Sequence, residues 1–368
     1  MLGIGPMASV HIELPHHTYA IQIEAGLLSL AGQRVWDIVP HGRCALVSDR
    51  TVSALYARPL ADSLEKVGFR VSQVDLDAGE SHKNAASIER LYRGFLEDRL
   101  ERSSPVIALG GGVVGDMAGF AAATYRRGVP FVQCPTSLLA MVDSSVGGKT
   151  GFNVPEGKNL IGAFHQPELV LIDPTVLRSL PRRELLCGIA ECIKHAVIRD
   201  PSLFEWMREN AQSILALDDA VMVELIERNV SIKAKVVMED EKEHGVRAHL
   251  NFGHTFAHAI EATAGYGEIL HGEAVALGML AATRASVEAG LCEEALLDSL
   301  EVLLDAFGLA TSSDLPENAI LEEAMRHDKK VIDDRIRLIL PEALGRITIR
   351  DDLSPVCVRS GWDHIRQH

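Results

Sequence analysis

Hydrophobic and polar residues alternate with two different periods along the first half of the chain. Short apolar runs predict buried strands at residues 44–49, 69–77, 105–112 and 130–136. Residues between them repeat apolar positions at helical spacing over 51–68, 84–100 and 114–124. Gly68 is a typical C-cap and Asn84 a typical N-cap for two of these helices. Strands that alternate with helices in this way favour a mostly parallel sheet with helices on both faces.

The pattern changes after the apolar segment LVLIDP at residues 169–174. From about residue 180 onward nearly every segment has helical periodicity. We therefore expect two domains, an α/β domain over residues 1–180 and an all-helical domain over residues 181–368.

Composition narrows the class of protein. The chain has 368 residues, of which 47% are hydrophobic, and a net charge of −15. An acidic surface repels a phosphate backbone, so nucleic-acid binding is not expected, although a small cationic pocket remains compatible with it. No uncharged apolar run approaches the length of a membrane span, and the first fifteen residues lack the pattern of a secretory signal.

Six cysteines are present without a CxxC pair or a disulfide-like spacing. Reduced thiols and a cytoplasmic location are the simplest interpretation.

Three separated residues offer the ligands of a divalent metal. Glu191 in GIAECIKH, His254 in NFGHTFAH and His271 in ILHGEAVALG supply one carboxylate and two imidazoles. This set is typical of a catalytic site with an open coordination position. Cys187 and Cys192 flank Glu191 and are alternative ligands.

His258 lies one helical turn after His254, where it would bind the metal, contact an anion or simply pack. The same segments carry further cations and amides, namely Lys194, Lys233, Arg247, Asn251 and His258. Such groups around a metal favour a small, oxygen-rich, anionic substrate.

A glycine-rich turn indicates a nucleotide. Gly110, Gly112 and Gly115 follow a predicted strand and open a predicted helix, where backbone N–H groups suit a pyrophosphate. No acid follows at the end of the next strand, so the motif is not a standard dinucleotide fingerprint. Asp49 ends an earlier strand and is a candidate for a ribose hydroxyl. A purely structural turn is the alternative.

Two other loops carry polar groups. Gly79, Glu80 and Lys83 follow a strand and suit a ribose and a phosphate, although polar loops are common. The glycine-rich segment 141–167 is a long loop or ribbon that holds Asp143, Lys149, Lys158 and Asn159.

Taken together, these segments resemble the 3-dehydroquinate synthase family. The stretches that match are GESHK, ALGGGVVGDMAGFAAATYRRG, CPTSLLAMVDSSVGGKTGFN, GKNLIGAFHQP, GIAECIKH, MEDEKEHGVRAHLNFGHTFAHAIE and HGEAVALGM. They run in the family's order from about residue 45 to 345. The resemblance implies a nucleotide-binding α/β domain followed by a helical metal- and substrate-binding domain, usually in a homodimer.

The resemblance also implies an activity. A member would use NAD and one zinc or cobalt ion to convert 3-deoxy-D-arabino-heptulosonate 7-phosphate into 3-dehydroquinate and phosphate. The steps would be transient oxidation, β-elimination of phosphate, re-reduction, ring opening and an intramolecular aldol closure.

Site residues carry over by position. The metal ligands would be Glu191, His254 and His271. The NAD site would comprise Asp49, Gly79, Glu80, Lys83, Gly111, Gly112, Val113, Val114, Gly115, Asp116, Thr136, Ser137, Lys149 and Lys158. The catalytic and substrate contacts would comprise Asp143, Lys149, Asn159, Lys194, Lys233, Arg247, Asn251 and His258. Ser137 stands where the family commonly has a second threonine, which keeps the hydroxyl.

Roles follow from chemistry. Lys194, Asn251 and His258 would hold phosphate, together with Arg127 lent by a second subunit. A late lysine, Lys329 or Lys330, would add to them. Arg247 suits a bidentate carboxylate, and Lys233 and Asp143 would orient the reacting oxygens.

Three alternatives remain open. Other sugar-phosphate cyclases share the metal and NAD but act on substrates without the same carboxylate. A metal-dependent polyol dehydrogenase shares the architecture and consumes NAD stoichiometrically. An inert binding protein with this fold would bind no metal.

Overall fold

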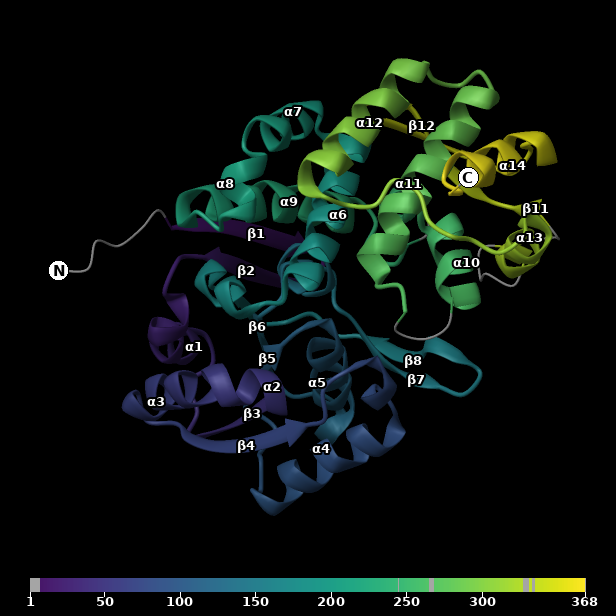
Figure 1. Ribbon diagram of the computed structural model, residues 1–368. Coiled ribbons are helices and arrows are strands. Elements are labelled where there is room, and N and C mark those ends of the chain that lie inside the picture. Colours follow the sequence, from purple (N-terminus) through teal and green to yellow (C-terminus); the bar gives the residue numbers. More distant parts are fainter. Residues whose placement is uncertain (1–6, 244, 265–267, 327–330, 333–334, 368) are drawn as a thin grey trace. The chain divides into compact units, whose positions relative to one another are not determined.

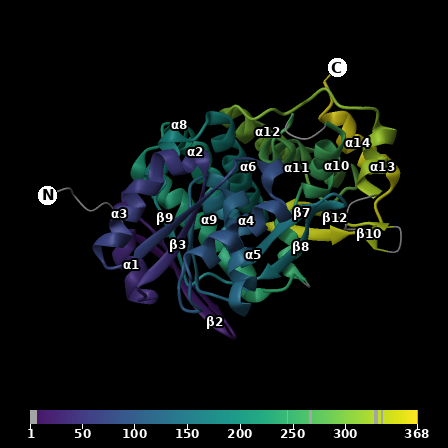
Figure 2. The same cartoon turned by 90° about the horizontal axis from the view of Figure 1, so that it is seen from below.

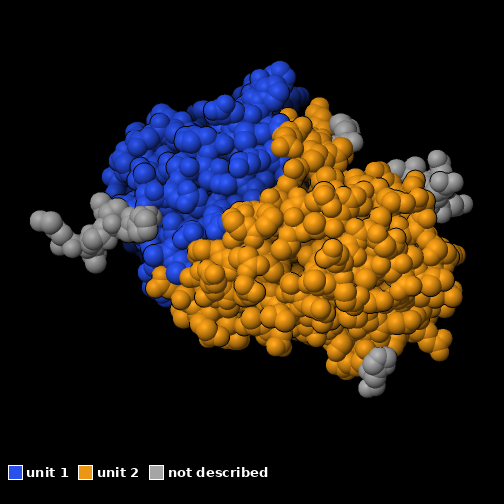
Figure 3. Space-filling view, turned by 90° about the horizontal axis from the view of Figure 1, so that it is seen from above, with its two compact units in different colours: residues 1–180, 219–238 blue, residues 181–218, 239–368 orange. Residues whose placement is uncertain are grey.

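The computed structural model describes residues 7–243, 245–264, 268–326, 331–332 and 335–367. The chain forms two compact units, one of residues 1–180 with 219–238 and one of residues 181–218 with 239–368 (Figure 3). Within the described residues, no helix combines the length and the apolar character that a membrane crossing needs.

A seven-stranded sheet forms the centre of the first unit. Its strands are β1 (Ala8–Leu14), β2 (His17–Ile23), β3 (Arg43–Asp49), β4 (Arg70–Leu76), β5 (Val106–Gly110), β6 (Phe131–Pro135) and β9 (Leu169–Ile172). They lie in the order β1-β2-β9-β6-β5-β3-β4. Every neighbouring pair is parallel except β1 with β2. The mostly parallel sheet is confirmed, and the antiparallel edge pair β1–β2 is an addition to the predicted strands.

Helices and a hairpin complete this unit. The helices are η1 (Leu27–Leu30), α1 (Ala31–Ile38), α2 (Arg50–Val52), η2 (Ser53–Ala57), α3 (Arg58–Lys66), η3 (Glu80–His82), α4 (Ala85–Glu97), α5 (Gly112–Thr124), η4 (Tyr125–Arg127), η5 (Ala140–Ser144), η6 (Pro174–Ser179) and α9 (Asp219–Glu239). The hairpin strands β7 (Lys149–Val154) and β8 (Gly157–Phe164) pair antiparallel and contact α5 (Figure 1 and Figure 2).

Both faces of the sheet are buried, as the near-continuous apolar strands require. Val47 and Ala108 face a core that includes Leu91 of α4 and Met117 of α5. The alternate strand residues, such as Ile107, are fully buried on the opposite face. Asn84 caps α4 by accepting from the Ser87 N–H at 3.1 Å, as its position in the sequence predicts.

The connections place a topological switch point in the sheet. The chain passes outward from β3 to β4 and then returns to the other side of β3 to form β5. Parallel strands that diverge in this way leave a crevice at their carboxyl ends, where α/β proteins bind ligands. Asp49 and Gly110 end the two strands that flank this point.

The second unit is rich in helices. They are α6 (Arg182–Arg199), α7 (Pro201–Glu209), α8 (Ala211–Leu215), η7 (Val246–Asn251), α10 (His254–Ala264), α11 (His271–Glu288), α12 (Glu294–Phe307), α13 (Asn318–Arg326) and α14 (Pro355–His364). Two hairpins follow α13, β10 (Val331–Ile332) with β11 (Arg335–Ile336) and β12 (Leu338–Ala343) with β13 (Arg346–Arg350). The helix-rich character is confirmed. The expectation that this half is entirely helical is wrong, because it also contains these two hairpins.

Helix α11 is the core element of this unit. It contacts α6, α10, α12, α14 and β12. Most of its residues are buried, and many are alanine or glycine, which lets neighbouring backbones approach closely. Gly278 shows this most clearly, because a Cβ at that position would meet the Gly253 carbonyl oxygen at 2.2 Å.

Residues 219–238 depart from the expected division of the chain at residue 180. Their helix, α9, counts with the first unit, not with the helical half that follows residue 180. Its ends are tied there: Arg178 donates to both Asp219 carboxylate oxygens at 2.7 and 2.8 Å, and the Glu13 N–H donates to Met238 Sδ at 3.4 Å. Helical periodicity alone could not reveal which unit buries the helix.

Candidate metal and nucleotide sites

The three residues proposed as metal ligands lie together in the second unit. Glu191 projects from the middle of α6, whereas His254 and His271 are the first residues of α10 and α11. One ligand atom of each lies within 4.8 Å of the other two. His254 Nε2 and His271 Nε2 are 3.7 and 3.6 Å from the same carboxylate oxygen, Glu191 Oε1.

The donor set fits a divalent metal. Glu191 is 1% exposed, and its Oε1 has no hydrogen-bond partner among the described residues. A buried carboxylate oxygen without a donor is costly unless a cation satisfies it. Tetrahedral zinc with bonds of about 2.0–2.2 Å separates its ligand atoms by about 3.4 Å, close to the observed distances.

Each imidazole has a second contact on its Nδ1 atom. His254 Nδ1 lies 3.1 Å from the Phe252 carbonyl oxygen, and His271 Nδ1 lies 3.4 Å from Glu261 Oε2. An acceptor at Nδ1 assigns the proton to that atom and leaves Nε2 available as a ligand. Both Nε2 atoms are the ones that face Glu191.

The charged groups of this cluster shift one another's pKa values. Burial by itself raises the pKa of Glu191, but Lys194, His271 and His254 outweigh it and hold that pKa well below its usual range. Burial lowers the pKa of His271, yet Glu191 and Glu261 raise it to about 10. Lys194 donates directly to Glu191 Oε2, so one oxygen of the carboxylate is neutralised while the other faces the imidazoles.

The cysteines do not join this cluster. None of the His, Cys, Asp and Glu groups that could hold a metal among the described residues includes a cysteine. Burial raises the pKa of Cys187 to about 12, which disfavours the thiolate that metals bind. The alternative that Cys187 or Cys192 serves as a ligand is therefore not supported. His258 lies beside His254, with ring centroids 5.7 Å apart, and is also outside the ligand group.

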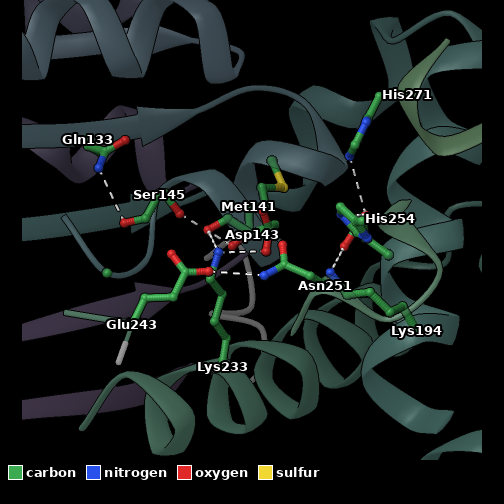
Figure 4. Close-up of polar contacts among 12 residues, drawn as sticks. Gln133, Met141, Asp143, Ser145, Lys194, Lys233, Glu243, Asn251, His254 and His271 are labelled. Atoms are coloured by element: carbon green, nitrogen blue, oxygen red, sulfur yellow. Dashed lines mark hydrogen bonds and ion pairs between the residues drawn. The ribbon is translucent and has the colours of Figure 1, made fainter. Parts of the chain in front are cut away.

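Two more of the predicted residues lie on η7 of the same unit. Arg247 is 2% exposed and donates to the Glu241 carbonyl oxygen. Asn251 donates from Nδ2 to Glu243 Oε1 at 3.0 Å (Figure 4). Lys329 and Lys330 fall outside the described residues.

In the first unit, the structure joins Asp143 and Lys233, which are 90 positions apart. Lys233 Nζ on α9 donates to Asp143 Oδ1 at 2.5 Å and also to the Asp143 carbonyl oxygen (Figure 4). Asp143 lies on η5, a single π-helical turn. Turns of this kind are rare and occur frequently at functional sites.

The glycine turn lies beside the switch point of the sheet. Gly111 is the N-cap of α5 and offers no side chain, so no side-chain cap binds the first N–H groups of this helix. Ser137 Oγ and Ser144 Oγ border the turn, 3.6 and 3.0 Å from the positions where a Cβ on Gly111 or Gly112 would lie. Uncapped N–H groups, a helix dipole and nearby hydroxyls suit an anion.

Part of the glycine pattern has a packing reason. A Cβ on Gly110 would meet Val114 Cβ at 2.7 Å, and one on Gly115 would meet Gln133 Oε1 at 2.9 Å. The structural interpretation therefore explains these two glycines, whereas Gly111 and Gly112 border the open end of the helix. Asp49 accepts from the N–H groups of Thr51 and Val52, so one of its oxygens is engaged as the N-cap of α2.

Lys83 connects three of the segments that the sequence analysis selected. Its Nζ donates to Asp116 Oδ2 at 2.5 Å and to Asn159 Oδ1 at 2.6 Å, and the residue is 4% exposed. Burial raises the pKa of Asp116, and the Lys83 ammonium opposes that shift. Lys149 and Lys158, in contrast, are exposed on the β7–β8 hairpin.

Asn153 is a site residue that sequence reasoning missed. Its Nδ2 donates to Glu80 Oε1 at 2.7 Å, and its Oδ1 accepts from the Asn159 N–H at 2.9 Å. It thus fixes the hairpin to the η3 loop. Only the folded hairpin brings these residues together.

Glu261 was also missed, although a signal for it exists. His254, His258 and Glu261 follow one another at spacings of four and three residues, which places them on one face of α10.

Comparisons with known proteins identify a related family. The 3-dehydroquinate synthase N-terminal family model matches residues 73–187, and the C-terminal model matches residues 188–331. The chain is 45% identical over 353 residues to 3-dehydroquinate synthase of Citrifermentans bemidjiense, which covers 95% of this chain and 98% of that relative.

Two solved structures share the architecture. One is 2-epi-5-epi-valiolone synthase from Streptomyces hygroscopicus with NAD+ and Zn2+ bound. It has a TM-score of 0.88 and 29% identity, and the match covers 96% of this chain and 98% of that one. The other is 2-deoxy-scyllo-inosose synthase with carbaglucose-6-phosphate, NAD+ and Co2+. Its TM-score is 0.85 at 25% identity, with 94% and 95% of the two chains covered.

Proposed function

The chain belongs to the 3-dehydroquinate synthase family, and we propose that it converts 3-deoxy-D-arabino-heptulosonate 7-phosphate into 3-dehydroquinate and phosphate. This reaction is that of a carbon–oxygen lyase. The observation that carries the proposal is the buried Glu191 oxygen, which faces two imidazoles and has no hydrogen-bond donor within the described parts of the chain. This oxygen supports a metal site at these residues, because two proteins with a similar fold were solved with NAD+ and Zn2+ or Co2+.

Glu191, His254 and His271 would hold the metal, and Asp49, Glu80, Lys83, the Gly111–Asp116 turn, Thr136 and Ser137 would hold NAD. When bound, the metal supplies Lewis-acid polarisation of a substrate oxygen, and NAD accepts and returns a hydride. The donor sets on the two units suit these ligands.

The remaining residues bind and orient the substrate. Lys194, Asn251 and His258 contact its phosphate in this proposal, and Arg247 contacts its carboxylate through the planar guanidinium. The burial of Arg247 favours a strong charge-assisted contact, because little water competes for it. Lys233 Nζ donates to Asp143 Oδ1, which holds the ammonium in place to orient a reacting oxygen in this proposal.

The test measures phosphate release from 3-deoxy-D-arabino-heptulosonate 7-phosphate. The full chain is supplied with much less NAD than substrate. We expect turnover that a chelator abolishes and that zinc or cobalt restores. Absorbance of reduced nicotinamide should not accumulate, because the hydride returns to the substrate. Net accumulation of NADH would instead identify a polyol dehydrogenase, and turnover that survives complete metal removal would overturn the proposal.

The main alternative is a sugar-phosphate cyclase for a substrate without a carboxylate. Two of the solved structures with a similar fold are 2-epi-5-epi-valiolone synthase and 2-deoxy-scyllo-inosose synthase. The buried Arg247 and the Lys158-Asn159 pair favour a carboxylate-bearing substrate. Assays of sedoheptulose 7-phosphate and glucose 6-phosphate beside the heptulosonate phosphate would discriminate the two, since an Arg247→Leu variant should lose activity only toward the sugar acid.

We also propose that the chain works as a homodimer to which Arg127 contributes across the interface. Strand β8 exposes Leu160, Ile161 and Phe164 at 46, 43 and 50%. Among the described strands it pairs only with β7, so one edge remains open for another chain. Arg126 and Arg127 have φ values of +50° and +66°, and this sparsely populated conformation presents Arg127 at the surface.

Mixing two inactive variants tests the dimer. Arg127→Ala and Lys194→Ala are unfolded together, refolded and compared with each variant refolded alone. If Arg127 acts in the partner's site, each heterodimer regains one intact site, and the mixture recovers roughly a quarter of wild-type activity. If Arg127 acts within its own subunit, the mixture stays inactive.

Finally, we propose a cytoplasmic location. All six cysteines are free in the structure, which agrees with a reducing compartment. Fractionation of the native host with an antibody to the chain would test this, and recovery outside the cytoplasm would contradict it.

A further inference from the structure

A second carboxylate lies behind one of the proposed metal ligands. Glu261 Oε2 is 3.4 Å from His271 Nδ1, on the side of the ring opposite to Glu191. From this arrangement we propose that Glu261 is a positioning residue that fixes the ring orientation and the tautomer of His271 and thereby sets the affinity of the site for its metal. The inference rests on the proposed metal role of Glu191, His254 and His271.

The fold holds Glu261 in place beside His271. The Glu261 side chain is 16% exposed and lies on the face of α10 that also carries His254. A half-buried carboxylate at Nδ1 attracts the ring proton more strongly than a neutral acceptor does, which makes Nε2 a better electron donor. At the corresponding atom, His254 Nδ1 lies 3.1 Å from the Phe252 carbonyl oxygen, so the acceptors at the two imidazoles differ in charge.

Other contacts fix the backbone at His271 without Glu261. Glu273 Oε2 accepts from the Leu270 N–H at 2.8 Å and closes the first turn of α11. Arg183 donates to Glu273 Oε1 and Oε2 at 2.5 and 2.7 Å. Gly272 packs against Cys187 so closely that a Cβ would lie 2.2 Å from its Cα.

A fixed backbone leaves rotation of the imidazole as the remaining freedom. His271 is the more exposed of the two rings, at 34% compared with 11% for His254, so packing restrains it less. The Glu261 carboxylate contacts the Nδ1 atom of this ring. Removing this carboxylate should therefore loosen the ring and weaken metal binding while leaving the fold intact.

The experiment compares Glu261→Ala, Glu261→Gln and a matched control. The control is Glu301→Gln, because Glu301 Oε1 lies 2.7 Å from His364 Nε2, so this variant also removes a carboxylate beside an imidazole, but away from the ligand group. Metal-free proteins are titrated with Zn2+ against a chromophoric chelator, and with Co2+ while the visible spectrum is recorded. Thermal unfolding of the metal-free proteins reports on the fold.

We expect Glu261→Ala to weaken Zn2+ binding by about 10–100-fold. Its Co2+ bands should shift or broaden. Its metal-free melting temperature near pH 10, where most of the stabilisation from a protonated His271 is lost, should stay near that of the wild type. Glu261→Gln should recover part of the affinity, because its amide oxygen still accepts from Nδ1–H. The control should bind metal like the wild type.

A His271→Ala variant distinguishes a failure of the positioning role of Glu261 from a failure of the proposed ligand set. If it loses Zn2+ affinity while both Glu261 variants bind like the wild type, the positioning role is wrong and the metal site stands. If His271→Ala itself binds Zn2+ normally, the proposed ligand set is wrong. Equal losses of metal-free stability and metal affinity in Glu261→Ala, without recovery in Glu261→Gln, would assign Glu261 a structural role instead.

Discussion

His271 lies between two carboxylates, and this placement governs how its charge responds to pH. Glu191 and Glu261 raise its pKa from 6.5 to about 10 against the opposing effect of burial. A folded pKa above the unfolded value means that the metal-free folded state binds the proton more tightly. The stabilisation is therefore complete below about pH 6.5 and is lost as the pH rises toward 10.

We predict that His271→Gln destabilises the metal-free protein more at pH 6 than at pH 9. At pH 6 the variant leaves the buried Glu191 carboxylate without part of its counter-charge, at a cost of about 3 kcal/mol. Urea unfolding of chelator-treated protein at the two pH values measures the difference. The exposed His82→Gln serves as the control, with an expected change within about 0.5 kcal/mol at both. A cost for His271→Gln that grows with pH would contradict the assignment.

Asn153 is expected to affect NAD binding, because its side chain connects two segments of the proposed nucleotide site. Asn153→Ala removes the contacts to Glu80 and to the Asn159 backbone, each worth about 1 kcal/mol. We expect NAD affinity to fall about 10-fold, measured by isothermal titration calorimetry. Gln33→Ala is the control, since it removes an exposed contact to Asp37 on α1. Unchanged NAD binding in Asn153→Ala would mean that the hairpin does not shape the site.

At the scale of elements, glycines set the spacing of the three helices that carry the proposed metal ligands. Gly272 brings the start of α11 against α6, and Gly278 and Gly253 bring α11 against α10. Gly253 also has a φ of +77°, which a side chain would strain just before His254. These contacts place the ligand atoms within one coordination sphere.

Gly272→Ala is predicted to damage both stability and metal binding. The added Cβ would lie 2.2 Å from Cys187 Cα and 2.5 Å from the Cys187 carbonyl oxygen, so α6 and α11 must separate. We expect a loss of more than about 2 kcal/mol together with weaker Zn2+ binding. Urea unfolding and the chelator competition assay measure the two effects.

Gly42→Ala is the matched control, because nothing lies within 4 Å of its Cβ position. It should leave stability and Zn2+ affinity close to the wild-type values. Wild-type Zn2+ affinity in Gly272→Ala would show that the close approach of the helices does not define the site.

Elements with strong periodicity were predictable, and elements defined by their partners were not. Strands β3 to β6 and helices α4 and α5 follow the apolar pattern within three residues at each end. The edge pair β1–β2 and the π-helical turn that carries Asp143 do not stand out in the sequence. Their backbones are stabilised by pairing and packing with distant residues, which local propensity does not record.

At the scale of the whole molecule, each unit holds its own set of ligand groups. The proposed metal ligands lie in residues 181–218 with 239–368, and the glycine turn, Lys83 and Asn159 lie in residues 1–180. We predict that Zn2+ alone slows amide hydrogen exchange in α6, α10 and α11, and that NAD alone slows it around Gly79–Lys83 and Gly111–Asp116. Mass spectrometry of peptides from the metal-free protein measures both, because a ligand suppresses opening where it binds.

Peptides from α12 serve as the reference, since this helix carries none of the proposed ligands. Protection by Zn2+ centred on the glycine turn, or by NAD centred on α10 and α11, would contradict the assignment of sites to units. Protection of α12 equal to that of α11 would indicate only general stabilisation.

The sequence by itself determined the fold class, the nucleotide turn and the three metal-ligand candidates. Period and residue type are local properties, and they survive in a linear chain: apolar alternation marks strands, and Glu191, His254 and His271 are recognisable by their chemistry. The family resemblance extended this to the substrate.

Only the tertiary structure decided which side chains act on one another. It joined Lys233 to Asp143, Lys83 to Asp116 and Asn159, and Glu261 to His271, and it assigned α9 to the first unit. These contacts depend on helix crossings and strand order, which arise from packing between distant segments. Because no local pattern encodes a distance between such segments, the partners of each ligand could be known only after the chain was folded.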